Sequence, residues 1–321
     1  MAWAVLLVLT LGGHAGAQNK VRLHLDWMVE GNHAPVFAAL EKGFYRQAGL
    51  RVEIEPGQGS FDAVKMVGVG KAEFGLADGG TMAKGVSQDI PVTMVASLFQ
   101  DTPMVVALLK RTGIRKPKDL EGHSIAMAPW ESTMFVFKVF ARLNRVDLGK
   151  VKVVPLSFAT KIPALVTGKV DSLGGYILEL GSPFLMGLKP EDRVEINLMK
   201  FSDYGIRMYS NGVIVNNRYM QEHPANVRAF VKASMKGLNY AMANPEQAAG
   251  FLRKHSELSR QLLLAKWKSV IPLHTSKATR QYGYGWMDRA KWESTQRIMV
   301  EHGGQKKALP LGQLFTNRFL R

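Results

Sequence analysis

The amino-acid sequence predicts an α/β protein of two lobes, in which each lobe is a mostly parallel sheet flanked by helices. Strand-like and helix-like segments alternate along the chain, which is typical of parallel sheets covered on both faces. The alternation restarts near His123. Two similar junctions, at residues 70–73 and 168–171, each end a helix, open a strand and lead to a glycine pair. Two such matches in the same order favour two similar lobes over one large domain.

The elements of the first lobe follow from the spacing of apolar residues. Apolar residues alternate or run continuously in the segments expected to be strands, which are residues 21–26, 51–55, 73–77 and 92–98. The segments between them are expected to be helices, over residues 34–48, 62–69 and 81–87. Gly49 is expected to end the helix over 34–48, because glycine commonly follows the last helical residue.

The second lobe repeats this order, and the chain then returns to the first lobe. We expect strands over 123–127 and 151–156 and helices over 132–143 and 161–167. The returning segments are a strand over 211–216, a long amphipathic helix over 225–243 and a helical C-terminal third. One lobe should therefore combine residues 18–103 with 210–321, and the other should span 104–209. A hinge is expected where the chain crosses, near residues 101–104 and 204–212.

Composition excludes several classes of protein. The 321 residues are 46% hydrophobic and 21% charged, unlike disordered, collagen-like or coiled-coil chains. The absence of cysteine excludes disulfides, thiolate metal ligands and cysteine nucleophiles. The net charge of +16 raises the question of nucleic-acid binding, but the basic residues are spread along the chain without a known module. The histidines are scattered as well, so we expect neither a nucleic-acid partner nor a metal site.

The N-terminus predicts export. Residues 5–11 are apolar and are followed by Ala15, Gly16 and Ala17, the small residues that a signal peptidase accepts. We expect residues 1–17 to be a cleavable signal peptide and Gln18 to begin the mature chain, although no Lys or Arg precedes the apolar run. The alternative is a buried N-terminal strand. Export without disulfides predicts a periplasmic location.

Three strand-to-helix loops are candidate ligand sites, because ligands of open α/β sheets bind beyond the carboxyl ends of the strands. The unpaired N–H groups at a helix start, flanking polar side chains and flat aromatic faces all favour a small molecule there. The candidate residues are Asp26, Trp27, Asn32 and His33 in the first loop, Asp78, Gly79 and Thr81 in the second, and Trp130, Glu131, Ser132 and Thr133 in the third. Packing, capping or an ordinary structural histidine would explain each residue taken singly.

Several motifs resemble the periplasmic binding proteins of ABC importers. The matching stretches are residues 25–27, 31–33, 39–45, 49–50, 70–75, 91–97 and 244–248. The sequence is most similar to the branch that binds the pyrimidine precursor of thiamine, which is related to binders of alkanesulfonates, taurine and nitrate. The resemblance implies a type II-like two-lobed fold with the ligand in the cleft between the lobes.

The resemblance also implies how such a ligand is held. Aromatic residues of both lobes would sandwich a flat heterocycle, and we assign this role to Trp27 and Trp130. The residues expected to form hydrogen bonds with the ring are Asp26, Asn32, His33 and Glu131. The residues expected to complete the wall are Tyr176, Tyr204 and Trp286. Residues 28–30 depart from the usual proline-containing turn, so riboflavin, an aromatic acid or a sulfonate stays open as the ligand.

An enzymatic role is the main alternative. The same fold serves enzymes that form the thiamine pyrimidine, but Thr81 stands near the position of their histidine and their Cys-rich stretch is absent. The chain also lacks a Gly-x-Ser-x-Gly elbow, a His-Glu-x-x-His helix and the glycine-rich nucleotide loops. We therefore expect binding without turnover and without a cofactor. The expected partners are a small-molecule ligand and an ABC permease of the inner membrane, and the protein should be a monomer.

Overall fold

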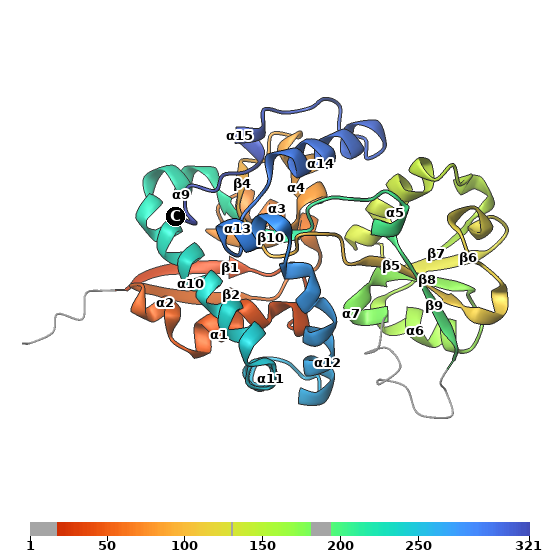
Figure 1. The fold of residues 1–321 in the computed structure, drawn as a ribbon, viewed down its shortest axis with the longest axis horizontal. Coiled ribbons are helices and arrows are strands. Elements are labelled where there is room, and N and C mark those ends of the chain that lie inside the picture. The colour runs from red at the N-terminus through yellow and green to blue at the C-terminus, as the bar shows by residue number, and fades with distance from the viewer. Residues whose placement is uncertain (1–17, 130, 181–193) are drawn as a thin grey trace, which may run out of the picture.

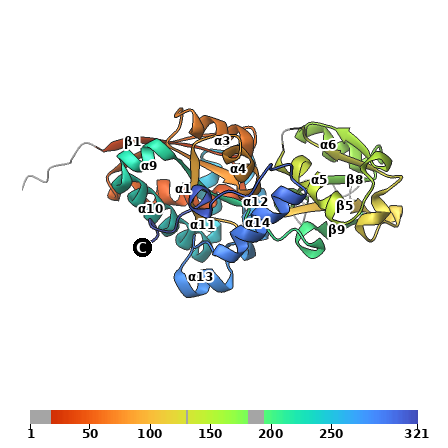
Figure 2. The ribbon, with the colours of Figure 1, turned by 90° about the horizontal axis from the view of Figure 1, so that it is seen from above.

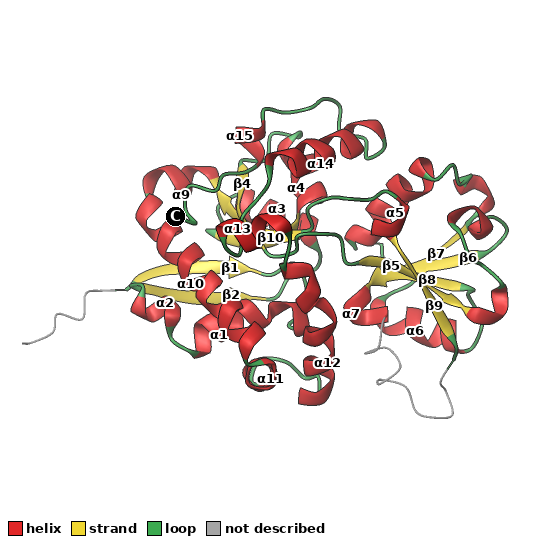
Figure 3. Ribbon diagram, in the orientation of Figure 1, coloured by secondary structure: helices red, strands yellow, loops and turns green. Residues whose placement is uncertain are grey.

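The computed structural model describes residues 18–129, 131–180 and 194–321, so the predicted signal peptide lies outside the described residues. Two five-stranded sheets with helices on their faces form two lobes that lie side by side (Figures 1 and 3). The described part of the chain contains no helix long and apolar enough to cross a membrane.

The first sheet has the order β2-β1-β3-β10-β4. Its strands are β1 (Asn19–His24), β2 (Leu50–Glu55), β3 (Phe74–Asp78), β4 (Val92–Ser97) and β10 (Asn211–Asn216). β10 is antiparallel to β3 and to β4, whereas β1 is parallel to β2 and to β3. A strand from late in the chain therefore completes the sheet that the first hundred residues begin.

Helices cover both faces of this sheet. The helices before β10 are α1 (Ala34–Glu41), α2 (Phe44–Gln47), α3 (Ser60–Gly68) and α4 (Gly79–Val86). Those after it are α9 (Asn217–Glu222), α10 (Pro224–Ala243), α11 (Pro245–Arg253), α12 (Arg260–Val270), α13 (Lys277–Tyr282), α14 (Arg289–Glu301) and α15 (Leu311–Leu314). The buried rings of Phe74 and Phe230 stack at 3.8 Å between centroids, which joins β3 to α10.

The second sheet has the order β7-β6-β8-β5-β9, with β5 as its antiparallel strand. Its strands are β5 (Met104–Leu109), β6 (Ser124–Met127), β7 (Lys152–Pro155), β8 (Ser172–Tyr176) and β9 (Ile196–Lys200). Its helices are α5 (Ser132–Leu143), α6 (Phe158–Val166) and α7 (Ile177–Leu180). Each sheet thus has one antiparallel strand among five, and the prediction of mostly parallel sheets is confirmed.

One predicted helix was wrong in its extent, and two strands, β5 and β9, were not predicted. The helix expected over 34–48 is interrupted at Gly43, whose φ of +69° is left-handed and cannot continue a helix, so α1 ends at Glu41 and α2 begins at Phe44. The strand β5 was not predicted, because all six of its residues are buried and an apolar run without alternation does not identify a strand. It begins at Met104, where only a chain crossing was expected.

Helices α12 and α14 belong to the first lobe and lie on the side that faces the second (Figure 2). In α14, Trp292 packs with the core beneath β4, whereas Ile298 and Met299 pack with the core of the second lobe. Helix α12 contacts α7 of the second lobe. The lobes therefore meet through side chains as well as through the two chain crossings between β4 and β5 and between β9 and β10.

Candidate functional site

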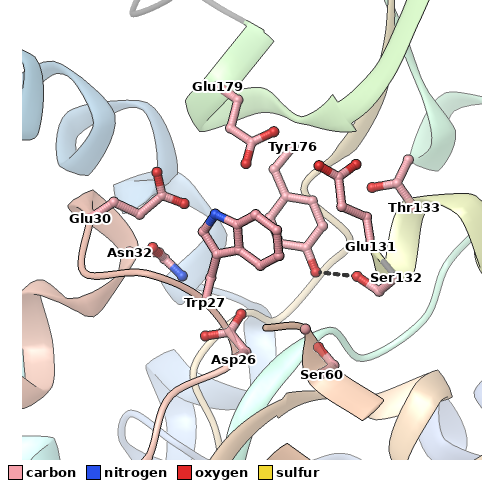
Figure 4. A pocket seen from close by; sticks show the side chains of 11 residues that line it. Asp26, Trp27, Glu30, Asn32, Ser60, Glu131, Ser132, Thr133, Tyr176 and Glu179 are labelled. Atoms are coloured by element: carbon pink, nitrogen blue, oxygen red, sulfur yellow. Dashed lines mark hydrogen bonds between the residues drawn. The ribbon is translucent and has the colours of Figure 1, made fainter. Parts of the chain in front are cut away.

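A small cavity lies between the lobes, where the loops after β1 and β6 face each other (Figure 4). The first lobe contributes Asp26, Trp27, Glu30, Asn32, Gly59 and Ser60, and the second contributes Glu131, Ser132, Thr133, Tyr176 and Glu179. Its volume is about 30 Å³. That space holds about one or two water molecules.

The loop after β1 is held by a buried hydrogen-bonded chain. The Nδ1 atom of His33 accepts a hydrogen bond from the backbone N–H of Glu30, which leaves Nε2 to donate to Oδ1 of Asp26 at 2.9 Å. Oδ2 of Asp26 accepts from Nδ2 of Asn211 at 2.6 Å. Both oxygens of Asp26 are therefore engaged within the protein, and His33 is fully buried. These two residues position the loop and its neighbours.

Glu30 lies at the end of this loop and pairs with helix α12. Its Oε2 atom is 2.6 Å from Nζ of Lys266, and both side chains are almost fully buried. Burial raises the pKa of Glu30, and the negative charge of Glu179 adds to this although Lys266 opposes it. The close approach of α12 requires a glycine after Glu30, because a Cβ on Gly31 would lie 2.5 Å from Cβ of Lys266.

The second lobe brings two carboxyl groups to one lysine. Nζ of Lys161, on α6, lies 2.6 Å from Oε1 of Glu131 and 3.5 Å from Oε2 of Glu179. Burial raises the pKa of Glu131 to about 7, and repulsion from Glu179 adds to the shift although Lys161 opposes it. The Glu131 carboxyl group is therefore able to donate or accept a hydrogen bond near neutral pH.

Three buried polar atoms of residues that line this cavity have no hydrogen-bond partner among the described residues. They are Oδ1 of Asn32, Oε2 of Glu131 and Oγ1 of Thr133. Buried polar atoms are usually paired, because leaving one unpaired costs about 1–3 kcal/mol. All three residues line the same small space and come from both lobes. Hydrogen-bonding capacity from both lobes is therefore left unused at one place.

Aromatic side chains line the same space. The indole of Trp27 lies between Glu30 and Glu131, in front of the ring of Tyr176 (Figure 4). The hydroxyl of Tyr176 forms a 2.8 Å hydrogen bond with Oγ of Ser132. Burial raises the pKa of Tyr176 well above its usual value, so the phenol stays neutral. The cavity thus combines flat apolar faces with carboxyl, amide and hydroxyl groups.

Part of the predicted site is brought together here. The predicted residues that line the cavity are Asp26, Trp27, Asn32, Glu131, Ser132, Thr133 and Tyr176. Trp130, predicted to stack on the ligand, lies outside the described residues. That these residues contact a ligand stays a prediction.

The second predicted loop has a structural role in this conformation. Asp78 caps α4 by accepting hydrogen bonds from the backbone and the hydroxyl of Thr81, and its other oxygen accepts from Ser210. A Cβ on Gly79 would lie 2.8 Å from the carbonyl oxygen of Tyr209. The loop therefore packs against the second chain crossing and does not line the cavity.

Two predicted wall residues lie elsewhere. Tyr204 packs edge to face against Phe140 in the core of the second lobe. Trp286 stacks on Tyr282, and its carbonyl oxygen accepts a hydrogen bond from Gln100. Neither lines the cavity.

Sequence reasoning missed Glu30, Gly59, Ser60 and Glu179. The acidic side chains of Glu30 and Glu179 could have indicated a site, because acidic residues beside predicted loops are candidates for ligand binding. Only the fold, however, brings these two residues to the same cavity. Ser60 begins α3, and its hydroxyl accepts a hydrogen bond from the N–H of Asp78. Although carboxyl groups gather here, the described residues include no group of three or more metal-ligating side chains arranged to hold an ion.

Proteins of related sequence include both binding proteins and enzymes. The riboflavin-binding protein RibY of Chloroflexus aurantiacus is 25% identical over 314 residues, which cover 94% of this chain and 86% of that protein. The formylaminopyrimidine-binding protein of Halalkalibacterium halodurans is 24% identical and covers 89% of this chain and 86% of its own. The 4-amino-5-hydroxymethyl-2-methylpyrimidine phosphate synthase of Legionella pneumophila is 23% identical, and the match covers 94% of this chain and 93% of that protein.

Solved structures with the same fold include periplasmic binding proteins and a desulfurization enzyme, DszB, which matches with a TM-score of 0.62 at 14% identity over 94% of this chain and 97% of its own. The aliphatic sulphonate binding protein SsuA of Escherichia coli matches with a TM-score of 0.71 at 14% identity, over 92% of this chain and 91% of its own. The nitrate-binding protein NrtA of Synechocystis matches with a TM-score of 0.65 at 12% identity, over 94% of this chain and 87% of its own. The predicted two-lobed fold is confirmed. Residues 30–248 match the family model described as NMT1/THI5 like, and the chain therefore belongs to the NMT1/THI5-like family.

Proposed function

We propose that this protein is an extracytoplasmic binding protein that holds a small nitrogen heterocycle between its lobes and delivers it to an ABC importer. The observation that carries the proposal is the set of three unpartnered buried atoms, on Asn32, Glu131 and Thr133, beside the faces of Trp27 and Tyr176. A flat ring with polar edge atoms pairs with these groups and covers the aromatic faces in one step.

The charges of the cavity favour a neutral or cationic ligand over an anion. Four carboxyl groups line it, from Asp26, Glu30, Glu131 and Glu179, whereas no Lys or Arg is among its described lining residues. Lys161 and Lys266 form ion pairs with these carboxyl groups, and neither lysine lines the cavity. A sulfonate or nitrate ion would face carboxylates without a matching cation, which is unfavourable at short range. The sulfonate alternative is therefore the weaker one.

The hydrogen-bonding groups suit a ring that both donates and accepts. The amide oxygen of Asn32 accepts, and the carboxyl group of Glu131, with its pKa near 7, either donates or accepts. An aminopyrimidine edge carries an N–H donor beside a ring-nitrogen acceptor, so it forms a two-point pair with a carboxylic acid. Relatives named for formylaminopyrimidine and for riboflavin, both nitrogen heterocycles, support this ligand class.

We propose binding without turnover, although some relatives are named as synthases. The chain has no cysteine. Burial alone would lower the pKa of Lys161, but Glu179 and Glu131 raise it, and Glu30 raises the pKa of Lys266 in the same way. Both lysines therefore stay protonated and are poor nucleophiles at neutral pH. The groups around the cavity bind and orient a ring, but they do not supply an activated nucleophile.

The proposal includes export of the protein and a hinge movement of its two lobes. Residues 1–17 would direct export and be removed before Gln18, and an ABC permease would receive the ligand. The two chain crossings, near residues 101–104 and 204–212, would form the hinge between a lobe of residues 18–103 with 210–321 and a lobe of residues 104–209. Because the cavity between the loops after β1 and β6 holds only about one or two water molecules, a whole ring would enter it only after the lobes move apart.

A ligand screen tests the proposal. Protein freed of bound solute is heated with pyrimidines, flavins, aromatic acids or sulfonates, and the expected result is a raised melting temperature with a nitrogen heterocycle. Mass spectrometry should then recover that compound unchanged. Preferential stabilisation by a sulfonate, or a chemically altered ligand, would contradict the proposal.

A further inference from the structure

A second and larger pocket adjoins the inter-lobe cavity. Its volume is about 830 Å³, and it shares Trp27, Glu30 and Glu179 with that cavity. We name it the outer pocket and the smaller one the inner cavity. Both lobes line the outer pocket, since Ile162 on α6 faces it from the second lobe and Leu262 on α12 faces it from the first.

The wall of the outer pocket is mostly apolar. Its apolar side chains include Met28, Phe37, Ile54, Ile162, Leu258 and Leu262. Met28 is 62% exposed, which is unusual for a large apolar residue in the described part of this chain. A flexible thioether at the mouth of a pocket adapts to apolar ligands of different outline. Its polar lining residues are Glu30, Glu179 and Lys266 at or beside the shared wall, and Ser157, His255, Ser256 and Glu257 elsewhere.

The two volumes show where the bulk of a ligand fits. Ligand pockets commonly measure about 300–1,000 Å³. The outer pocket lies in this range, whereas the inner cavity, at about 30 Å³, admits only a few polar edge atoms in this conformation. A ligand that satisfies the inner cavity must therefore extend past Trp27, and the part that extends meets an apolar wall.

We propose that the ligand is a fused-ring nitrogen heterocycle, whose polar ring edge meets the inner cavity and whose apolar ring or rings fill the outer pocket. This inference rests on the proposed function and narrows its ligand class. A single pyrimidine ring leaves the outer pocket empty and forgoes its apolar contacts. The carboxyl groups at the shared wall set the orientation, because they attract the N–H groups of the ring edge and not its hydrocarbon end.

Matched pairs of compounds test this inference by calorimetric titration of the full mature protein. Uracil and lumichrome share a pyrimidinedione edge, and 4-aminopyrimidine and 4-aminoquinazoline share an aminopyrimidine edge, but only the second member of each pair has an additional apolar ring. For at least one pair the fused compound should bind at least about tenfold more tightly, which is the gain expected from burying one further ring face.

Two variants fill the outer pocket from opposite lobes. Ile162→Trp and Leu262→Trp should each weaken binding of the fused compound by about tenfold or more. Val69→Trp is the matched control, because Val69 is 71% exposed and lines neither pocket, and it should bind as wild type does. Melting curves confirm that each variant is folded, and the comparison of compounds on the wild type needs no variant.

The outcomes are distinguishable. Equal or tighter binding of the single-ring member in both pairs overturns the inference but leaves the proposed function standing. Unchanged affinity for the fused compound in both folded tryptophan variants likewise overturns the inference and leaves the proposed function standing. Absence of binding by all four compounds overturns the proposed function together with the inference.

Discussion

Oε1 of Glu131 lies 2.6 Å from Nζ of Lys161, whereas Oε2 of the same carboxyl group is buried without a hydrogen-bond partner among the described residues. One oxygen is thus fixed within the second lobe, and the other keeps hydrogen-bonding capacity at a residue that lines the inter-lobe cavity. This asymmetry orients the carboxyl plane before any ligand arrives, which reduces the ordering cost of binding.

Replacing Glu131 by Gln should change how stability depends on pH. The pKa of Glu131 is raised from 4.5 to about 7 in the folded protein, so its contribution to stability is full below about pH 4.5 and is lost as the pH rises through 7. The loss amounts to at most about 3 kcal/mol. The free energy of unfolding, measured with urea, should fall between pH 5 and pH 8 in the wild type. In Glu131→Gln it should fall less over the same pH range. Glu195→Gln, at a side chain that is 80% exposed, should behave as wild type.

His274 should make the protein sensitive to acid. Burial lowers its pKa to about 3, and the ring lies between Phe99 and Trp267. The group therefore contributes stability above about pH 6.5 that is lost as the pH falls toward 3, and the loss is about 2 kcal/mol at pH 5. His274→Phe should keep more of its pH 7.5 stability at pH 5 than wild type does, as measured by urea unfolding. An equal loss in both proteins would contradict this, and the exposed His223→Phe is the control.

Gly31 should be intolerant of a side chain. An added Cβ would lie 2.5 Å from both Cβ of Lys266 and the backbone nitrogen of Trp267, so α12 must shift and the Glu30–Lys266 pair with it. Gly31→Ala should lower the free energy of unfolding by about 1–3 kcal/mol and weaken ligand binding. Gly312→Ala has no neighbouring atom within 4 Å and should be neutral or stabilising by less than about 1 kcal/mol. Similar stabilities for the two variants would refute the packing argument.

Trp27→Ala should weaken binding with little change in melting temperature. The indole lines both the inner cavity and the outer pocket, so its loss removes a stacking face and buried area and should cost at least about tenfold in affinity. Trp267→Phe is the contrasting variant, since Trp267 is fully buried and its Nε1–H donates to the carbonyl of Ala241. That variant should melt several degrees lower. Calorimetric titration and melting curves on both variants check this, and wild-type affinity for Trp27→Ala would show that the site is misassigned.

The sequence predicted local elements well where one physical signal dominated. β10 and α5 have the predicted bounds, because turn or capping residues flank clear apolar patterns. Trp27 and Glu131 were found because each follows the carboxyl end of a strand, which is a position fixed by topology.

Other features depend on contacts between distant segments. Lys161 reaches Glu179 because α6 packs against β8, which runs directly into α7, and Lys266 is 236 residues from its partner Glu30. No local pattern gives such a pairing. The outer pocket is likewise built from segments of both lobes, and its size follows from how the lobes close.

The position of β10 has a consequence for how the chain folds. Among the described strands, β4 has only β10 as a neighbour, and its isolated bridges are to residues 285 and 315, so residues 92–97 find no described sheet partner until residues 211–216 have been made. The second lobe, whose strands all lie between residues 104 and 200, is enclosed in that interval and pairs only within itself. We therefore expect the lobe that starts the chain to finish folding last. Its long-range pairing should make this step slow, and a chain halted before residue 211 should expose the edge of β4 to aggregation.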